Sequence, residues 1–297
     1  MKYIKAHSRL VGFLLILVLS AGTIFAWYAV WWHEKYSGKL LLAAFDVGQG
    51  DSIFIQAENG NQVLIDGGPN SSVLTGLGRV MPFWDHSIDT IILTHPHADH
   101  VDGLVDVLKR YHVGMVIESE VNFSLPEYDE FNALIHQKKI QLVRAQAGQR
   151  LQLSKETSLD ILTPMNDFTG KSPSNVHDSM VVSHLTHGST TVLLMGDAER
   201  SVEYQLMASD TNLHADILKV GHHGSMTSTS AEFLQAVQPK TAIISVGKKN
   251  RYGHPNQGII DRLETFGAKV FRTDEDGYIQ IVINENDYSV TTQKQKN

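Results

Sequence analysis

The sequence predicts an α+β protein in which two packed β-sheets carry helices on their outer faces, preceded by one apolar N-terminal helix. The first observation behind this prediction is the pattern after residue 38, where short apolar runs alternate with amphipathic stretches of helical period. The second is that each half of this region begins with strands and continues with alternating helices and strands. The third is the composition, because 42% hydrophobic and 19% charged residues are typical of a folded globular chain.

The N-terminal segment is expected to be a membrane anchor. Residues 10–32 contain no charged side chain. As a helix they would span about 34 Å, against roughly 30 Å for the hydrocarbon core of a bilayer. Basic residues precede this segment and Trp and Tyr cluster at its end, which predicts a cytoplasmic stub at 1–9 and a single-pass transmembrane helix at 10–32. Residues 33–38 would then be a linker and residues 39–297 one extracellular domain. The alternative is a signal peptide, whose cleavage would release a secreted domain.

The first half of the domain is expected to contain a series of strands and two helices. The pair Asn59-Gly60 between two apolar runs predicts a hairpin turn. A helix over 101–111 would place Leu104 and Leu108 on one face, and a helix over 127–138 is opened by Pro126. The expected strands are 40–46, 52–57, 62–66, 88–93, 113–117, 140–144 and 158–162.

The second half follows a polar loop at 166–175 that contains glycine and proline. Residues 180–186 and 190–195 predict a hairpin around His187-Gly188. Expected helices at 199–207, 230–237 and 256–266 alternate with strands at 216–220 and 241–246, and the C-terminal end is strand-like.

The sequence HPHADH at residues 95–100 directly follows a predicted strand and places four candidate metal ligands within six residues. In an extended segment, residues i and i+2 point the same way, so His95 and His97 can hold one metal ion. The turn into the following helix would bring Asp99 and His100 towards a second ion. Because the chain has 15 His and no Cys, its metal sites must use His, Asp and Glu, which suit Zn²⁺ and Mn²⁺ alike.

This H-x-H-x-D-H motif after a strand resembles the signature of the metallo-β-lactamase superfamily. Asp66 with its two following glycines resembles the strand-end Asp of that superfamily, and GDA at 196–198 resembles the motif whose Asp bridges two metal ions. GHHGS at 221–225 resembles the motif that supplies a His to the second ion. The resemblance implies a four-layer αββα sandwich and a two-metal hydrolase.

A closer resemblance is to the β-lactamase-like domain of the ComEC family of competence proteins. The matching stretches are FDVGQGDS at 45–52, MGDAE at 195–199, ADILKVGHHGS at 215–225, YGHP at 252–255 and RTD at 272–274. This resemblance implies cleavage of phosphodiesters, with DNA as the substrate in competence-like uptake or processing.

The resemblance also implies the ligands of two divalent ions, Zn²⁺ or Mn²⁺. The metal ligands would be His95, His97, Asp99, His100, Asp197 and His222. Asp66 and Asp178 are expected to hold these ligands in position without binding the ions themselves. The third ligand of the first ion stays open between His177, Asp178 and a water. The Gly-His order favours His222 over His223 as a ligand, which leaves His223 for substrate binding or proton transfer. Asp99 and His223 are the expected catalytic residues.

Ser225 and His254 are expected to bind a substrate phosphate. The net charge of −7 argues against a surface built for non-specific DNA binding, and it becomes −10 once Lys2, Lys5 and Arg9 are set aside. The alternative substrate to DNA is therefore a small phosphodiester such as wall-linked phosphorylcholine. A lactone or β-lactam is the third candidate substrate. A non-catalytic binding module that kept the fold is the alternative outside enzymes, and the membrane is the other expected partner.

Overall fold

The computed structural model describes residues 2–36, 38–285 and 287–296, and it divides into two compact units, Met1–Gly38 and Lys39–Asn297. The first unit consists of helix α1 (Lys2–Tyr36). Of the described helices, only α1 is long and apolar enough to cross a membrane, through Gly12–Trp32. Because neither Pro nor Gly interrupts residues 33–36, α1 continues through most of the expected linker.

One of the two sheets in the second unit has eight strands, and neighbouring strands follow the order β15-β14-β1-β2-β3-β4-β5-β6. Strands β3 to β6 run parallel to one another, whereas the other neighbours are antiparallel. The strands are β1 (Leu40–Ala44), β2 (Ile53–Gln56), β3 (Gln62–Ile65), β4 (Ser87–Ile92), β5 (His112–Glu118), β6 (Gln141–Arg144), β14 (Ile279–Ile283) and β15 (Tyr288–Thr292). Its helices are α2 (Ser72–Val80), α3 (Ala98–Arg110) and α4 (Pro126–Lys138).

A seven-stranded sheet follows, in the order β13-β12-β11-β10-β9-β8-β7, with β10 to β13 parallel. Its strands are β7 (Arg150–Gln152), β8 (Thr157–Ile161), β9 (Ser183–His187), β10 (Thr190–Leu194), β11 (Ile217–Lys219), β12 (Thr241–Ile244) and β13 (Lys269–Arg272). The helices of this half are α5 (Arg200–Met207), α6 (Ala231–Val237), α7 (Gln257–Thr265) and α8 (Thr273–Asp276). Three 3-10 turns complete the described elements: η1 (Val176–Ser179), η2 (Gly221–Gly224) and η3 (Gln293–Lys296).

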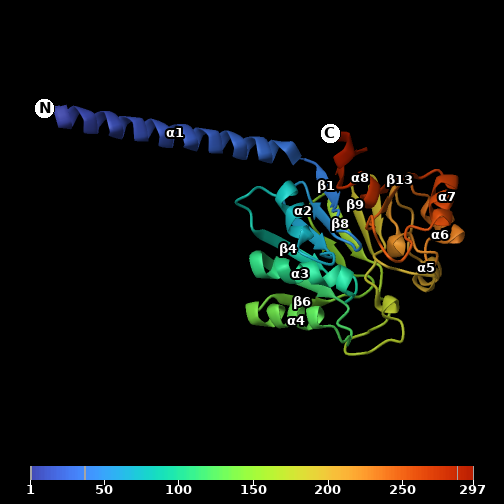
Figure 1. Ribbon diagram of the computed structural model, residues 1–297. Helices are drawn as coiled ribbons and strands as arrows, with labels where there is room; N and C mark the ends of the chain where they lie inside the picture. The colour runs from blue at the N-terminus through green and yellow to red at the C-terminus, as the bar shows by residue number, and fades with distance from the viewer. Residues whose placement is uncertain (1, 37, 286, 297) are drawn as a thin grey trace. The chain divides into compact units, whose positions relative to one another are not determined.

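Two apolar clusters of described residues pack the sheets against each other and cover the second sheet. The first lies between the sheets and joins Leu42 and Ile55 of one sheet to Leu185 and Ile217 of the other. The second joins the outer face of the second sheet to α5, α6 and α7, through residues such as Phe233. Helices α2, α3 and α4 lie along the first sheet, and α5, α6 and α7 lie beyond the second (Figure 1). The expected αββα arrangement is therefore confirmed.

Both expected hairpins are present, but α2 was not expected from the sequence. Its two glycines lower its helix propensity. The tertiary structure explains Gly76, because a Cβ there would lie 2.4 Å from the ring of Phe45. Helix α3 begins at Ala98, earlier than expected, so Asp99 and His100 lie in its first turn.

The carboxyl ends of the parallel strands converge on one edge of the sandwich, where an ion pair connects the two sheets. Lys219, the last residue of β11, is completely buried, and its Nζ lies 2.5 Å from Oδ2 of Asp51, between β1 and β2. The same Nζ donates to the carbonyls of Val220 (2.9 Å) and Gly196 (3.4 Å). Because a buried charge is costly without a partner, each of these two residues requires the other.

We expect Lys219→Met to destabilise the domain by about 3–5 kcal/mol, because it leaves the Asp51 carboxylate buried without its cation. The double variant Asp51→Asn/Lys219→Met should recover part of this loss, since it removes both charges. Chemical denaturation of the detergent-solubilised full chain, with chelator present, measures both. Lys240→Met is the matched control, because Lys240 pairs with Asp216 at 2.8 Å but its side chain is 72% exposed. Equal effects of Lys219→Met and Lys240→Met would contradict the prediction.

Candidate metal centre

Four segments bring histidine and aspartate side chains together at the edge where the parallel strands end. The first runs from the end of β4 into α3, and the second is η1, which precedes β9. The other two follow β10 and β11. The segments lie far apart in the sequence but share this edge because β4, β10 and β11 all end there.

His95, His97 and His177 form the first group, whose ligand atoms lie within 4.8 Å of one another. Nε2 of His95 lies 2.9 Å from Nδ1 of His97, as expected from their i, i+2 spacing. The ring of His177 lies 5.2 Å from that of His95 and 5.1 Å from that of His97. Of the three candidates left open for the third ligand, the structure therefore brings His177 to this position.

Asp178 points elsewhere, because its Oδ1 accepts a hydrogen bond from Oγ of Ser201 at 3.1 Å. The candidate metal groups found among the described residues do not include it. The expected supporting role of Asp178 is therefore not reflected in the geometry.

Asp99, His100, Asp197 and His223 form the second group. Nε2 of His100 lies 3.3 Å from Oδ2 of Asp197 and 3.9 Å from Oδ2 of Asp99. Nε2 of His223 lies 3.4 Å from Oδ1 of Asp197 and 3.5 Å from Oδ2 of Asp99. Asp197 also lies 3.9 Å from Nε2 of His95, so its carboxylate faces both groups, as expected for a bridging ligand.

His222 and His223 lie the other way round from the expected arrangement. His223 is buried and joins Asp99 in the second group, whereas Nε2 of His222 lies 3.9 Å from Asp197 in a group with His177. Both histidines have left-handed φ values, 46° and 54°, and their rings lie 6.2 Å apart at an angle of 61°. The geometry therefore places His223, and not His222, beside Asp99 and His100, while His222 stays in the group with His177 and Asp197.

Contacts on the far side of the rings fix which nitrogen faces the centre. Nδ1 of His100 lies 2.7 Å from Oδ2 of Asp66, which also accepts from Thr94. Nδ1 of His223 lies 2.9 Å from the carbonyl of Ser245, so it carries the proton. In both rings Nε2 is thereby the nitrogen that faces the centre, where its lone pair is available once the ring is neutral.

The surroundings hold three groups in the charge state that metal ligation needs. Burial, together with the nearby His177 and His100, lowers the pKa of His97 to about 4, so this imidazole is neutral at pH 7. Burial and His100 likewise lower the pKa of His95. Burial would raise the pKa of Asp99, but the charge of His100 and the close approach of the His223 ring bring it down to about 2.

His100 and His223 differ from these. Burial opposes their protonation, but Asp197 reverses the effect and raises the pKa of both rings. Both rings must lose a proton before they can bind a cation, so we expect metal binding to release protons.

The donor set fits divalent cations. Four buried atoms of the two groups have no hydrogen-bond partner: Nε2 of His100, His177 and His223, and Oδ1 of Asp197. Buried polar atoms are normally hydrogen-bonded, so unsatisfied atoms that face one another require an explanation. Imidazole and carboxylate in this arrangement are ligands of Zn²⁺ or Mn²⁺, and coordination would satisfy these atoms.

Two residues of the site received no role from the sequence. Asp51 Oδ1 lies 3.5 Å from Nδ1 of His223, and Glu199 Oε1 lies 3.3 Å from Nδ1 of His222. Glu199 Oε2 also lies 3.7 Å from Nδ1 of His177. Both acidic residues fall within the stretches that resemble the ComEC domain, so the resemblance could have identified them as site residues. Their positions in the sequence do not show which side chains they contact.

The two residues expected to bind substrate lie on the same side of the fold as this centre. Ser225 follows η2 and is buried, with its Oγ 3.0 Å from Oγ1 of Thr227. His254 is half-buried, and its ring lies 5.7 Å from that of His222. His254 is therefore at the rim of the centre, whereas the Ser225 hydroxyl is engaged within its own turn.

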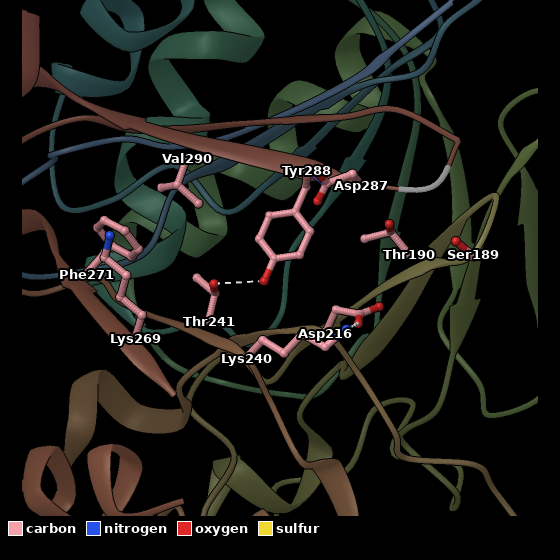
Figure 2. Close-up of a pocket in the computed structure, with 10 residues that line it drawn as sticks. All are labelled: Ser189, Thr190, Asp216, Lys240, Thr241, Lys269, Phe271, Asp287, Tyr288 and Val290. Atoms are coloured by element: carbon pink, nitrogen blue, oxygen red, sulfur yellow. Dashed lines mark hydrogen bonds and ion pairs between the residues drawn. The ribbon is translucent and has the colours of Figure 1, made fainter. Parts of the chain in front are cut away.

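A separate pocket of about 450 Å³ lies where β10, β12 and β13 begin, at their amino ends (Figure 2). Its charged groups are already engaged, because Lys240 pairs with Asp216 and Lys269 lies 4.9 Å from the centre of the Phe271 ring. Tyr288 points towards Thr241 across the pocket, with 2.9 Å between their hydroxyls. The centre at the carboxyl ends is therefore the stronger candidate.

Comparisons with known proteins agree with this fold. Residues 45–248 match the family model of the metallo-beta-lactamase superfamily. The chain is 34% identical over 252 residues to ComE operon protein 3 of Bacillus subtilis (strain 168), a match that covers 79% of this chain and 32% of that protein. It is 29% identical over 248 residues to Competence protein ComA of Neisseria gonorrhoeae, with 80% and 32% covered. The chain thus spans about a third of the length of these curated relatives.

A solved structure gives the same result for the fold. The metallo-beta-lactamase fold protein YhfI from Bacillus subtilis superposes with a TM-score of 0.55 at 13% identity, covering 85% of this chain and 99% of that one. Because the family model matches more than half of the residues, this chain belongs to the metallo-β-lactamase superfamily, and it is related to the competence proteins of the ComEC type.

Proposed function

We propose that residues 39–297 form an extracellular, two-metal phosphodiesterase that acts on DNA and is anchored in the membrane by residues 10–32. One observation carries the proposal: unpartnered ring nitrogens and a carboxylate oxygen converge at one edge of the fold. When bound, two divalent ions would lower the pKa of water towards about 7 and stabilise negative charge on phosphate oxygens. This hydrolytic chemistry is typical of the superfamily and needs no separate strong base.

The chain's own residues would position that chemistry. Asp99 and Asp197 are ionised, because neighbouring histidines keep the pKa of each carboxyl low despite burial. Asp66 and the Ser245 carbonyl hold the rings of His100 and His223 so that each presents Nε2 to the centre. We propose His95, His97, His177 and Asp197 for one ion, and Asp99, His100, Asp197 and His223 for the other.

The choice of DNA rests on the relatives, whose names connect them with competence. One observation favours a second candidate, a small phosphodiester such as a phosphorylcholine ester. The charge of −10 outside the first nine residues repels a long polyanion wherever it is not offset locally. Two divalent ions would offset it at the centre itself.

Substrate class is tested with the full chain in detergent, loaded with Mn²⁺ or Zn²⁺. We expect cleavage of labelled single- or double-stranded DNA in preference to phosphorylcholine esters and lactones. Cleavage of another ester without any cleavage of DNA would favour the second candidate. Absence of any bindable divalent metal would contradict the enzyme and support a non-catalytic binding module.

Asp99→Ala should reduce hydrolysis of bis-p-nitrophenyl phosphate at least about 100-fold, because it removes a carboxylate that faces both His100 and His223. The matched control is Asp102→Ala, one turn along α3 and outside the candidate groups. Steady-state rates and metal content by mass spectrometry check both variants. Undiminished hydrolysis by the Asp99 variant would show that the site is assigned wrongly.

Asp66→Ala should weaken metal binding by about 10- to 100-fold, since His100 loses the acceptor that fixes its tautomer. Competition with a fluorescent chelator measures the affinity without relying on activity. An unchanged affinity would exclude the orienting role of Asp66.

Membrane topology can be tested directly because the chain has no cysteine. We expect Lys155→Cys, an exposed position in the domain, to react with a membrane-impermeant maleimide in intact cells. Ser8→Cys should react only after lysis. The reverse pattern would contradict the proposed orientation, and a labelled product in the medium would indicate a cleaved signal peptide.

A further inference from the structure

We propose that Tyr252 and Arg251 form a stacking subsite for a nucleobase next to the phosphodiester held at the metal centre. The inference rests on the proposed function and narrows its substrate to a nucleic-acid strand with accessible bases. It concerns the loop at residues 247–255, which joins β12 to α7.

The side chain of Asn250 makes four hydrogen bonds within the loop. Oδ1 of Asn250 accepts hydrogen bonds from the backbone N–H groups of Tyr252 (3.1 Å) and His254 (3.0 Å). Its Nδ2 donates to the carbonyls of Gly247 (2.9 Å) and His254 (2.7 Å). The loop is also attached to the residues before Asp51, because the N–H of Gly247 donates to Oε1 of Gln49 at 3.1 Å. The Tyr252 ring is therefore presented by a preorganised loop, which lowers the entropy cost of binding.

A row of aromatic rings connects Tyr252 to the metal centre. The rings of Tyr252 and His254 are stacked, with centroids 5.9 Å apart and an angle of 16°. His254 lies 5.7 Å from His222, which lies 4.8 Å from His177. One ring, that of His254, thus lies between Tyr252 and His222, and His177 is one ring further on. Tyr252 is 55% exposed. A large exposed ring beside a hydrolytic centre is an available contact for the substrate.

The charges around this ring indicate the chemistry of its ligand. The guanidinium carbon of Arg251 lies 5.2 Å from the centre of the Tyr252 ring, and its Nη2 donates to the Tyr252 hydroxyl at 3.1 Å. Lys248 and Lys249 in the same loop are exposed, so positive charge gathers here in a domain that is otherwise acidic. Aromatic rings interleaved with basic side chains suit single-stranded nucleic acid, whose bases stack while its phosphates pair.

The same arrangement disfavours the cationic group of a choline ester. An aromatic site for a quaternary ammonium needs a ring face free of other cations, whereas Arg251 already lies over Tyr252. The Tyr252 ring is also stacked with His254. A guanidinium can itself stack on a base, so a nucleobase would stack on Arg251, which the Tyr252 ring supports.

The test compares two ligands of equal length and charge on the full chain in detergent: a labelled oligothymidylate and the same backbone without bases. Binding is measured by fluorescence anisotropy with chelator present, so that cleavage does not interfere. We expect the wild-type chain to prefer the strand with bases by a factor of about 5 to 150. Tyr252→Ala should bring this preference close to one, whereas Tyr252→Phe should retain it.

Phe266→Ala is the matched control, because Phe266 is also an exposed aromatic residue but follows the far end of α7, away from the metal centre. It should leave the preference unchanged. A wild-type preference near one, or an undiminished preference in Tyr252→Ala, would overturn the subsite. Failure of the wild-type chain to hydrolyse bis-p-nitrophenyl phosphate would instead count against the proposed phosphodiesterase, independently of the binding result.

Discussion

The buried ion pair between Lys219 and Asp51 is the contact on which the arrangement of the metal centre depends. It joins the two sheets, and the same ammonium group binds the carbonyls of Gly196 and Val220, next to the turns that carry Asp197 and the two histidines. Asp51 in turn contacts the first turn of α3, because its N–H donates to the Asp99 carbonyl at 3.3 Å. At Gly50 a Cβ would lie 2.2 Å from that carbonyl oxygen, so only glycine permits this approach.

The centre combines two electrostatic environments within one edge of the fold. On the His95 and His97 side, burial and neighbouring histidines keep the imidazoles neutral. On the His100 and His223 side, Asp197 favours the protonated rings, and a bound cation would take the place of those protons. Asp197 contacts both sides, so its carboxylate couples them.

The net charge of the domain and the local charge near the metal centre have opposite effects on the binding of a polyanion. The acidic surface disfavours a polyanion in general, while the 247–255 loop and two divalent ions would provide local attraction where cleavage occurs. The names of the relatives and the exposed ring of Tyr252 near the centre both support the proposed class of substrate.

The sequence by itself determined the αββα architecture, the candidate ligands in HPHADH and their attachment to a strand end, because these follow from local periodicity and from close spacing along the chain. It did not determine α2, since Gly76 makes sense only once Phe45 packs against it. Nor did it determine which of His222 and His223 turns inward. That choice depends on two left-handed backbone angles and on the Ser245 carbonyl at the end of β12. Only the tertiary structure brings His177, Asp51 and Glu199 to the site, because long-range contacts between strand ends leave no periodic signal in the sequence.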